Sequence, residues 1–170
     1  MEFFDTIRKR GSYRAEFDQV EIPKEDLKEI VEAGVLAPSG YNHQTTSFLV
    51  VVDAQLRQEL AKIAPTPAMK TAAAIIVPLS EYWQAENGLS FEIEDYACAV
   101  ENVMLAITAK GYAGVWMDGQ MKLDNGSERV AELLHVEEGK HVRAMIPVGK
   151  PLQQVVQREK KPLQERVRFI

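Results

Sequence analysis

The segment from about Phe91 to Lys110 constrains the fold of this chain more than any other. Its apolar residues recur at steps of three and four, the spacing of one face of an α-helix, and Gly111 follows where a glycine commonly ends a helix. The apolar positions are Tyr96, Ala99, Val100, Val103, Met104 and Ile107. The pattern predicts a long helix that buries this stripe, so the rest of the chain must supply the other side of a core.

Four shorter helices are predicted as well. The clearest begins at Pro23, because proline suits the first helical position, and ends near Ala37, because the residue before a proline disfavours helical geometry. The others occupy residues 3–10, a short stretch after an N-cap at Asp53, and residues 127–134.

Short apolar runs between these helices predict buried strands at residues 48–52, 72–79 and 142–148, with a shorter strand at residues 115–117. Strands separated by helices indicate a mixed α/β layer architecture. A chain of 170 residues is the usual size of one domain and is long enough to bury a substantial core. We therefore expect a single domain over residues 1–170.

The charge balance excludes several classes of partner. Lys and Arg total 20 against 25 Asp and Glu, a formal net charge of -5, whereas nucleic-acid binders and proteins of anionic membranes present a basic surface. No apolar run approaches the roughly 20 residues that cross a bilayer, and the first residues lack the pattern of a secretory signal. A single cysteine, Cys98, fits a reducing compartment. We expect a cytoplasmic location.

Residues 150–170 form an unusual tail. Pro151 and Pro162 flank a polar, basic stretch with little periodicity. A long irregular segment on a compact domain is uncommon unless it packs against something. A partner subunit is one economical solution.

The first segment with chemical potential is Arg10-Gly-Ser-Tyr-Arg14. Two guanidinium groups with a hydroxyl between them suit a multiply charged oxyanion such as a phosphate. The segment alone has an equally good structural explanation. In that reading Arg8, Lys9 and Arg10 complement the negative end of the first helix, while Ser12 makes a turn.

The second segment is Ala37-Pro-Ser-Gly-Tyr-Asn-His-Gln44, which lies between a predicted helix and the first buried strand. Its proline, serine, glycine and asparagine residues are turn formers, so composition alone favours an ordinary loop. Ser39, Asn42 and Gln44 also supply neutral donors and acceptors, which can bind a heterocycle with carbonyl and imide edges.

These segments occur together in an order that resembles the nitroreductase-like family of FMN-dependent oxidoreductases. The resemblance begins with Arg-x-Ser-x-Arg and Ala-Pro-Ser-x-x-Asn-x-Gln. It continues through residues 95–119, Ile146-Pro-Val-Gly-Lys-Pro151 and the basic Lys160-Lys-Pro-Leu163. It therefore covers nearly the whole chain.

The resemblance implies an α+β fold with a central, mostly antiparallel sheet flanked by helices. It also implies an interlocked homodimer, in which residues 150–170 cross onto the partner subunit. Two FMN sites would then lie at the interface, each built from both chains.

By the same resemblance, several residues match cofactor contacts. Arg10 and Ser12 match positions at the FMN phosphate and ribityl chain, and Arg14 matches the basic residue near the pyrimidine edge of the flavin or its phosphate. Lys160 matches a phosphate ligand from the tail, with Lys161 as a rival.

The remaining matches concern the ring system. A loop presented by the partner subunit comprises Pro38, Ser39, Gly40 and Asn42. Asp118 and Gly119 match the place where a backbone N–H faces flavin N5, and Lys70 is a further contact to the pyrimidine carbonyl edge.

The implied reaction is a ping-pong transfer through FMN N5, from NADH or NADPH to nitroaromatics, quinones or similar electron-poor acceptors. No catalytic side-chain base is expected. A metal site is not expected either, since His135 and His141 lack ligand spacing. Two alternatives stay open: a non-catalytic flavin-binding or regulatory protein, and a family member that uses FMN for dehalogenation or flavin breakdown. The second ranks lower, because such members usually carry an extra lid and the connection from Ser80 to Ser90 is short.

The chain departs from the family pattern at three places. Gly11 stands where a larger, often basic residue is common, which predicts one missing phosphate or ribityl contact. Gly40 replaces a common serine, although its backbone can still serve. Thr45-Thr46 follows Gln44 where Pro-Trp is frequent, which predicts altered packing behind the flavin or at the dimer interface.

A few other side chains have competing interpretations. Cys98 is expected to be a small core residue, and Asn102 to make a structural hydrogen bond. His43 suits a solvent or interface position. The aromatic residues expected either to line the substrate mouth or only to pack are Tyr82, Trp83 and Phe91.

Overall fold

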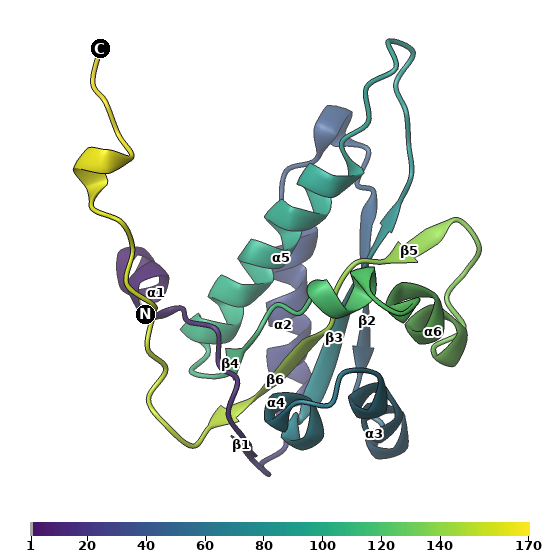
Figure 1. The fold of residues 1–170 in the computed structure, drawn as a ribbon, viewed down its shortest axis with the longest axis vertical. Coiled ribbons are helices and arrows are strands. Elements are labelled where there is room, and N and C mark those ends of the chain that lie inside the picture. The colour runs from purple at the N-terminus through teal and green to yellow at the C-terminus, as the bar shows by residue number, and fades with distance from the viewer. Residues whose placement is uncertain (1) are drawn as a thin grey trace.

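The computed structural model describes residues 2–170, and it is an α+β structure with one six-stranded sheet (Figure 1). The strand order is β1-β6-β3-β2, with β4 paired to β6 and β5 paired to β3. Every pairing between these strands is antiparallel, which confirms the expected mostly antiparallel sheet. The strands are β1 (Phe17–Asp18), β2 (Thr46–Val51), β3 (Ala74–Glu81), β4 (Ala113–Gly114), β5 (Lys140–Val142) and β6 (Ile146–Pro151).

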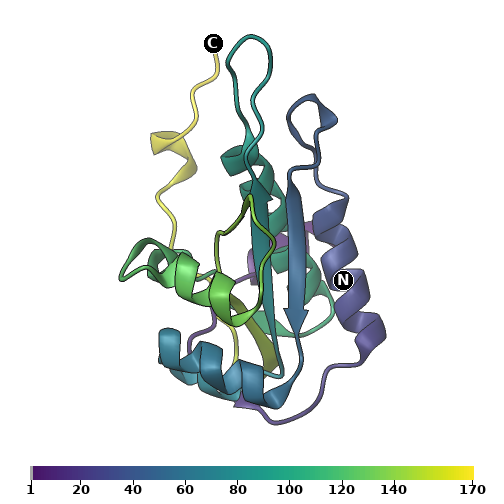
Figure 2. The same cartoon turned by 90° about the vertical axis from the view of Figure 1, so that its right-hand side faces the viewer.

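Helices cover both faces of the sheet. Figure 2 shows α2 and α5 on one side of β2 and β3, and α3, α4 and α6 on the other. The α-helices are α1 (Phe3–Lys9), α2 (Lys24–Val35), α3 (Ala54–Ile63), α4 (Pro67–Thr71), α5 (Glu92–Ala109) and α6 (Gly126–Leu133). Three short 3₁₀ helices complete the structure: η1 (Gly40–Asn42), η2 (Gly119–Lys122) and η3 (Leu163–Glu165).

The long helix α5 confirms the prediction made from its apolar spacing. Its whole predicted stripe is buried, and it packs with α2 against the sheet. Gly111 adopts a φ of 79° immediately after the helix, where a residue without Cβ is favoured. The stripe also explains why Cys98 is exposed, contrary to expectation. Position 98 falls on the solvent side of the helix, between the buried Tyr96 and Ala99.

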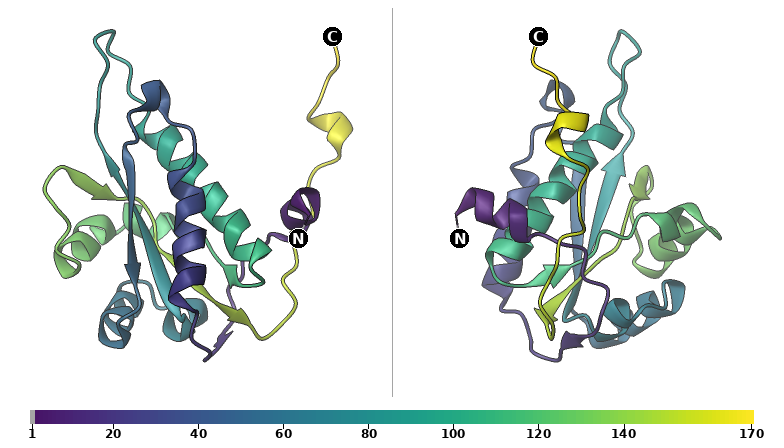
Figure 3. Two further views of the ribbon diagram at one scale, coloured as in Figure 1. Left: turned by 180° about the vertical axis from the view of Figure 1, so that it is seen from behind. Right: turned by 60° about the vertical axis from the view of Figure 1, so that its left-hand side comes forward.

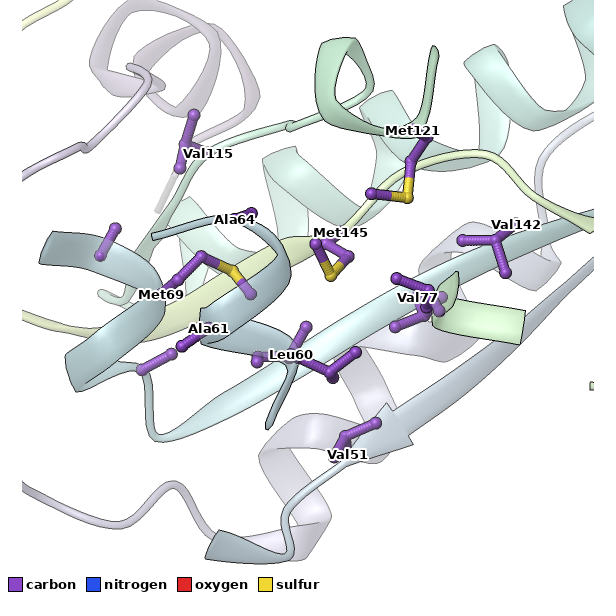
Figure 4. Close-up of a cluster of buried hydrophobic side chains, with 14 of the residues drawn as sticks. Val51, Leu60, Ala61, Ala64, Met69, Val77, Val115, Met121, Val142 and Met145 are labelled. Carbon is purple, nitrogen blue, oxygen red and sulfur yellow. The ribbon is translucent and has the colours of Figure 1, made fainter. Parts of the chain in front are cut away.

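Strand β3 lies at the centre of the core, because both of its faces are covered. Ile75, Val77 and Leu79 face the layer of α3, α4 and α6, while Ala74 and Ile76 face the layer of α2 and α5. Figure 4 shows the first of these two clusters, in which Val77 lies near Met145 and Leu60. A strand buried on both faces has a continuous apolar run instead of an alternating one, which is the pattern that predicted it.

The predicted strand at residues 142–148 is instead two strands, β5 and β6. The chain turns away between them: the Arg143 amide donates to the Pro78 carbonyl at 3.0 Å, and Met145 pairs with Met117. The strand predicted at residues 115–117 is also misplaced, because β4 comprises only Ala113–Gly114 and Met117 forms only an isolated bridge with Met145.

Candidate cofactor site

The segment Arg10–Arg14 leaves α1 and runs beside the sheet. The Tyr13 amide donates to the Gly114 carbonyl at 2.9 Å, and Ser12 forms a parallel bridge with Gly114. The tail returns to the same place, because the side-chain amide of Gln157 donates to the carbonyls of Ile7 and Arg10, each at 3.0 Å. The segment Arg10–Arg14 and the first part of the tail therefore meet at the C-terminal end of α1.

A hollow of about 320 Å³ opens where this segment meets the tail. Four residues predicted to bind the cofactor line it, together with three residues that the sequence did not single out as ligands. The lining is Arg10, Ser12 and Arg14 with Gly11 from the first segment, and Gln157, Arg158 and Lys160 from the tail. Lys160, and not its neighbour Lys161, is the lysine of this lining.

The cations of the hollow keep donors that a ligand could use. The Arg10 guanidinium lies 3.5 Å from the Glu101 carboxylate, and the Arg14 guanidinium makes a long contact of 3.5 Å to the Ser12 carbonyl. Arg14, Ser12 and Lys160 are all exposed. The hollow is thus a region of concentrated positive charge in a chain whose net charge is -5.

Close packing explains why position 11 is a glycine. A Cβ at this buried position would lie 2.8 Å from Cγ1 of Val155 and 2.9 Å from the Val156 carbonyl oxygen. The missing side chain therefore lets the tail lie directly against the first segment. Residues of the tail then line the hollow beside this glycine.

The loop from Pro38 to Gln44 lies elsewhere in the chain, against the first turn of α5. It includes η1, and the Gln44 amide donates to the Ser39 hydroxyl at 3.0 Å. Pro38, Ser39 and Gln44 line a second, smaller hollow with Asp95 of α5. Arg10 instead meets α5 at Glu101, nearly two turns further along. Within one chain the loop and the Arg10 hollow are therefore separate.

Aromatic side chains gather beside this loop. The Trp83 ring stacks on His43, with the ring centres 3.3 Å apart, and Tyr41 makes edge contacts with Trp83 and Phe91. Tyr41, His43 and Trp83 line a hollow of about 400 Å³. Tyr82 is 56% exposed. The cluster joins the loop to the segment between β3 and α5.

The Asp118–Gly119 segment presents an available backbone donor. Gly119 is exposed, a Cβ on it would meet no atom within 4 Å, and its amide has no hydrogen-bond acceptor within residues 2–170. The Asp118 carboxylate is held by Lys122 at 2.8 Å, and this contact raises the pKa of Lys122. Burial raises the pKa of the nearby Tyr96, and the charge of Asp118 raises it further.

Lys70 is not brought to the Arg10 hollow. It is exposed at the end of α4 and lines a different hollow with Gln19, Glu21 and Arg57. Its role at a flavin stays a prediction.

Across residues 2–170, no three or more His, Cys, Asp or Glu side chains are grouped so that they could hold a metal ion. Within the same described range, no helix has the length and apolar character needed to span a membrane.

Comparison with known proteins identifies the family. A model of the nitroreductase family matches residues 7–150, so the chain belongs to the nitroreductase family. A relative from Archaeoglobus fulgidus, named as a candidate NADH dehydrogenase/NAD(P)H nitroreductase, is 28% identical over 151 residues, which span 88% of this chain and 86% of that protein.

Two solved structures share the fold. One is a candidate NADH dehydrogenase/NAD(P)H nitroreductase from Parabacteroides distasonis, with a TM-score of 0.85 and 24% identity over 98% of this chain and 96% of that chain. The other is the NADPH:FMN oxidoreductase of Vibrio harveyi complexed with NAD⁺, with a TM-score of 0.83 and 27% identity. The match covers 98% of this chain and 76% of the Vibrio chain.

Proposed function

We propose that this protein is a homodimeric, FMN-dependent oxidoreductase that uses NADH or NADPH to reduce nitroaromatics, quinones or similar electron-poor acceptors. Family membership supports the class of enzyme, and the names of the relatives support a nicotinamide donor. We choose FMN as the cofactor because of one observation, the hollow lined by Arg10, Ser12, Arg14 and Lys160.

The chemistry of this hollow fits the phosphate of FMN. A phosphate monoester carries close to two negative charges at neutral pH and accepts several hydrogen bonds. The guanidinium groups supply charge-assisted donors, and the Ser12 hydroxyl supplies a neutral one. We assign Arg10, Ser12 and Lys160 to the phosphate, and Arg14 to the phosphate or the adjacent edge of the flavin.

Bound FMN would supply the redox chemistry, taking two electrons from the nicotinamide and passing them to the acceptor in a second half-reaction. The chain's own groups would orient the cofactor and stabilise charge. The Gly119 amide can donate to a ring nitrogen without adding a titratable group. Lys70 and Arg14 are the cations we assign to the negative charge near the pyrimidine edge of the reduced ring, which is a preorganised electrostatic role.

The second half of the site would come from a second copy of the chain. Pro38, Ser39, Gly40 and Asn42 lie away from the Arg10 hollow of their own chain, so they would serve the cofactor held by the partner. The tail after Lys160 would cross in the same direction. We place this dimer in the cytoplasm, where the exposed thiol of Cys98 would stay reduced.

The test is the visible absorption spectrum of the purified protein, recorded anaerobically before and after each nicotinamide. We expect a bound flavin that NADH or NADPH bleaches and that a nitroaromatic or a quinone restores. Protein that is colourless and takes up no added FMN would contradict the proposal. Bound FMN that neither nicotinamide reduces would point to the non-catalytic alternative, while turnover with oxygen alone would favour flavin breakdown.

A further inference from the structure

Asp95 is a buried carboxylate with no role in the site described so far. It is 4% exposed and lies in the first turn of α5. Its Oδ1 accepts a hydrogen bond from the Gly40 amide at 2.8 Å, and its Oδ2 accepts one from the Thr45 hydroxyl at 2.7 Å. In the part of the chain described, no Lys, Arg or His lies within 4.0 Å of it. Its charge is therefore stabilised by these two donors and by the positive end of the helix.

The two donors lie at either end of a strained loop. Between Gly40 and Thr45, the residues Tyr41, Asn42 and Gln44 have φ angles of 50°, 57° and 53°. Residues other than glycine adopt such angles infrequently, so a run of them persists only where contacts outside the run hold it in place. Asp95 provides such contacts at both ends of the loop.

Packing of the loop against the start of α5 accounts for two places where the chain departs from its family's pattern. A Cβ at Gly40 would lie 2.5 Å from Cδ2 of Phe91, the residue just before α5, so the serine that is common here would not fit against this helix. A proline at position 45 has no hydroxyl to donate, whereas Thr45 donates to Asp95. Both departures adapt the loop to the start of α5.

We propose that Asp95 is a positioning residue, which holds residues 38–45 in the conformation that contacts the flavin bound to the partner subunit. Asp95 acts through Gly40 and Thr45 and touches no substrate or cofactor itself. The inference rests on the proposed FMN function, because the loop is a cofactor contact only if that function is correct.

Three substitutions test the proposal together. Thr45→Val removes the hydrogen bond to Asp95 at nearly constant volume, whereas Thr45→Ser keeps the hydroxyl that donates it. Asp95→Asn removes the charge and turns one acceptor into a donor. The matched control is Asn102→Ala, which removes a hydrogen bond of 3.0 Å from the same helix to the Ala33 carbonyl without touching the loop.

Two measurements are made on each purified variant. Hydrogen exchange of the peptide covering residues 38–45, without added FMN, reports whether Asp95 holds the loop. FMN affinity, from quenching of flavin fluorescence, reports whether that hold matters for the cofactor. In Thr45→Val and Asp95→Asn we expect faster exchange and an FMN dissociation constant about tenfold higher, the effect of losing one hydrogen bond to a charged group. Thr45→Ser and Asn102→Ala should match the wild type on both counts.

The outcomes distinguish a failure of the positioning role of Asp95 from a failure of the proposed FMN function. Unchanged exchange in Thr45→Val and Asp95→Asn would overturn the claim that Asp95 holds the loop. Faster exchange with unchanged FMN affinity and an unchanged flavin spectrum would overturn the positioning role. Wild-type protein that binds no FMN would refute the proposed function instead, and the exchange data would still show whether the loop depends on Asp95.

Discussion

Arg14 is the residue whose removal best tests the cationic hollow. Its guanidinium is exposed and makes only a long contact to the Ser12 carbonyl, so little of the fold depends on it. We expect Arg14→Ala to raise the FMN dissociation constant by about tenfold or more, or to slow flavin reduction, because one charge-assisted contact is lost. Equilibrium FMN titration and anaerobic stopped-flow reduction would measure both.

The control for Arg14 is Arg8→Ala. Arg8 lies on α1 with a 73% exposed side chain paired to Asp5, so the substitution removes the same charge from the same end of the chain without altering the hollow. The role of Arg14 would be refuted if the two variants bound FMN and reacted equally well, both like the wild type.

At the residue scale, sequence could identify side chains whose chemistry is carried by local spacing. Arg10, Ser12 and Arg14 lie within five consecutive positions, and the structure places them around one hollow with Lys160. Gln157 and Asp95 act through partners far along the chain, at Arg10 and at Gly40. Such contacts depend on the tertiary fold, so nothing in the neighbouring residues could have indicated them.

At the element scale, a cluster of polar side chains joins the residues after α5 to the first turns of α2. The Tyr112 hydroxyl donates to Asp26 at 2.6 Å, and Lys110 pairs with Asp26 at 3.0 Å and with Glu29 at 2.5 Å. Burial, followed by the hydrogen bond to Asp26, raises the pKa of Tyr112 to about 12. The hydrogen bond from Tyr112, followed by that from Lys110, lowers the pKa of Asp26.

These shifts predict how stability depends on pH. Because the folded pKa of Tyr112 is raised, its contribution is complete below the ordinary value of 10.0 and is lost as the pH rises toward about 12. Because the folded pKa of Asp26 is lowered, its contribution is complete above the ordinary value of 3.8 and is lost as the pH falls below it. The hydrogen bond between them should therefore be strongest between these limits.

We expect Tyr112→Phe to lower the melting temperature by about 2–4 °C at neutral pH, the usual effect of one lost hydrogen bond in a protein of this size. The difference from the wild type should shrink below pH 4 and above pH 10, where the wild type loses the same contribution. Thermal melts across this range would measure it, with Tyr82→Phe as the control because Tyr82 is 56% exposed. A difference that stays constant with pH would contradict this account.

A helix or strand could be predicted from the sequence where its own residues show a clear hydrophobic period. The stripe of α5 and the run of β3 are long enough to define their type, and Asp53 caps α3 as expected, accepting from the Leu56 amide at 2.8 Å. The helix α4 has only five residues, too few to show a period. The break between β5 and β6 is set by the pairing of Met145 with Met117, a contact between distant segments.

At the scale of the whole molecule, contacts within one chain do not explain the position of the tail. Figure 1 and the left panel of Figure 3 show it passing α1 and extending away from the sheet. Its apolar residues are exposed: Leu163 by 66%, Val167 by 43%, and Phe169 and Ile170 almost completely. Exposed apolar groups at the end of an irregular segment are typical of a surface that is buried by a partner.

Removing residues 163–170 should therefore weaken the proposed homodimer while leaving the cationic hollow of each chain intact, because that hollow uses no residue beyond Lys160. Burying a large apolar side chain contributes roughly 1.5–3 kcal/mol, so the loss of Phe169 and Ile170 alone should raise the dimer dissociation constant by at least about 100-fold. FMN affinity should fall with it, since the loop from Pro38 to Asn42 would serve the partner's cofactor. Sedimentation velocity over a concentration series, with and without FMN, would measure both effects.

The control keeps the apolar groups and removes only charge, as the double variant Arg166→Gln, Arg168→Gln. It should sediment like the wild type, because exposed charges at an interface rim add little to affinity. If burial of the tail drives assembly, the truncated chain dissociates and this variant does not. A full-length chain that is monomeric at tens of micromolar, or a truncated chain that dimerises equally well, would show that the tail does not hold two copies together.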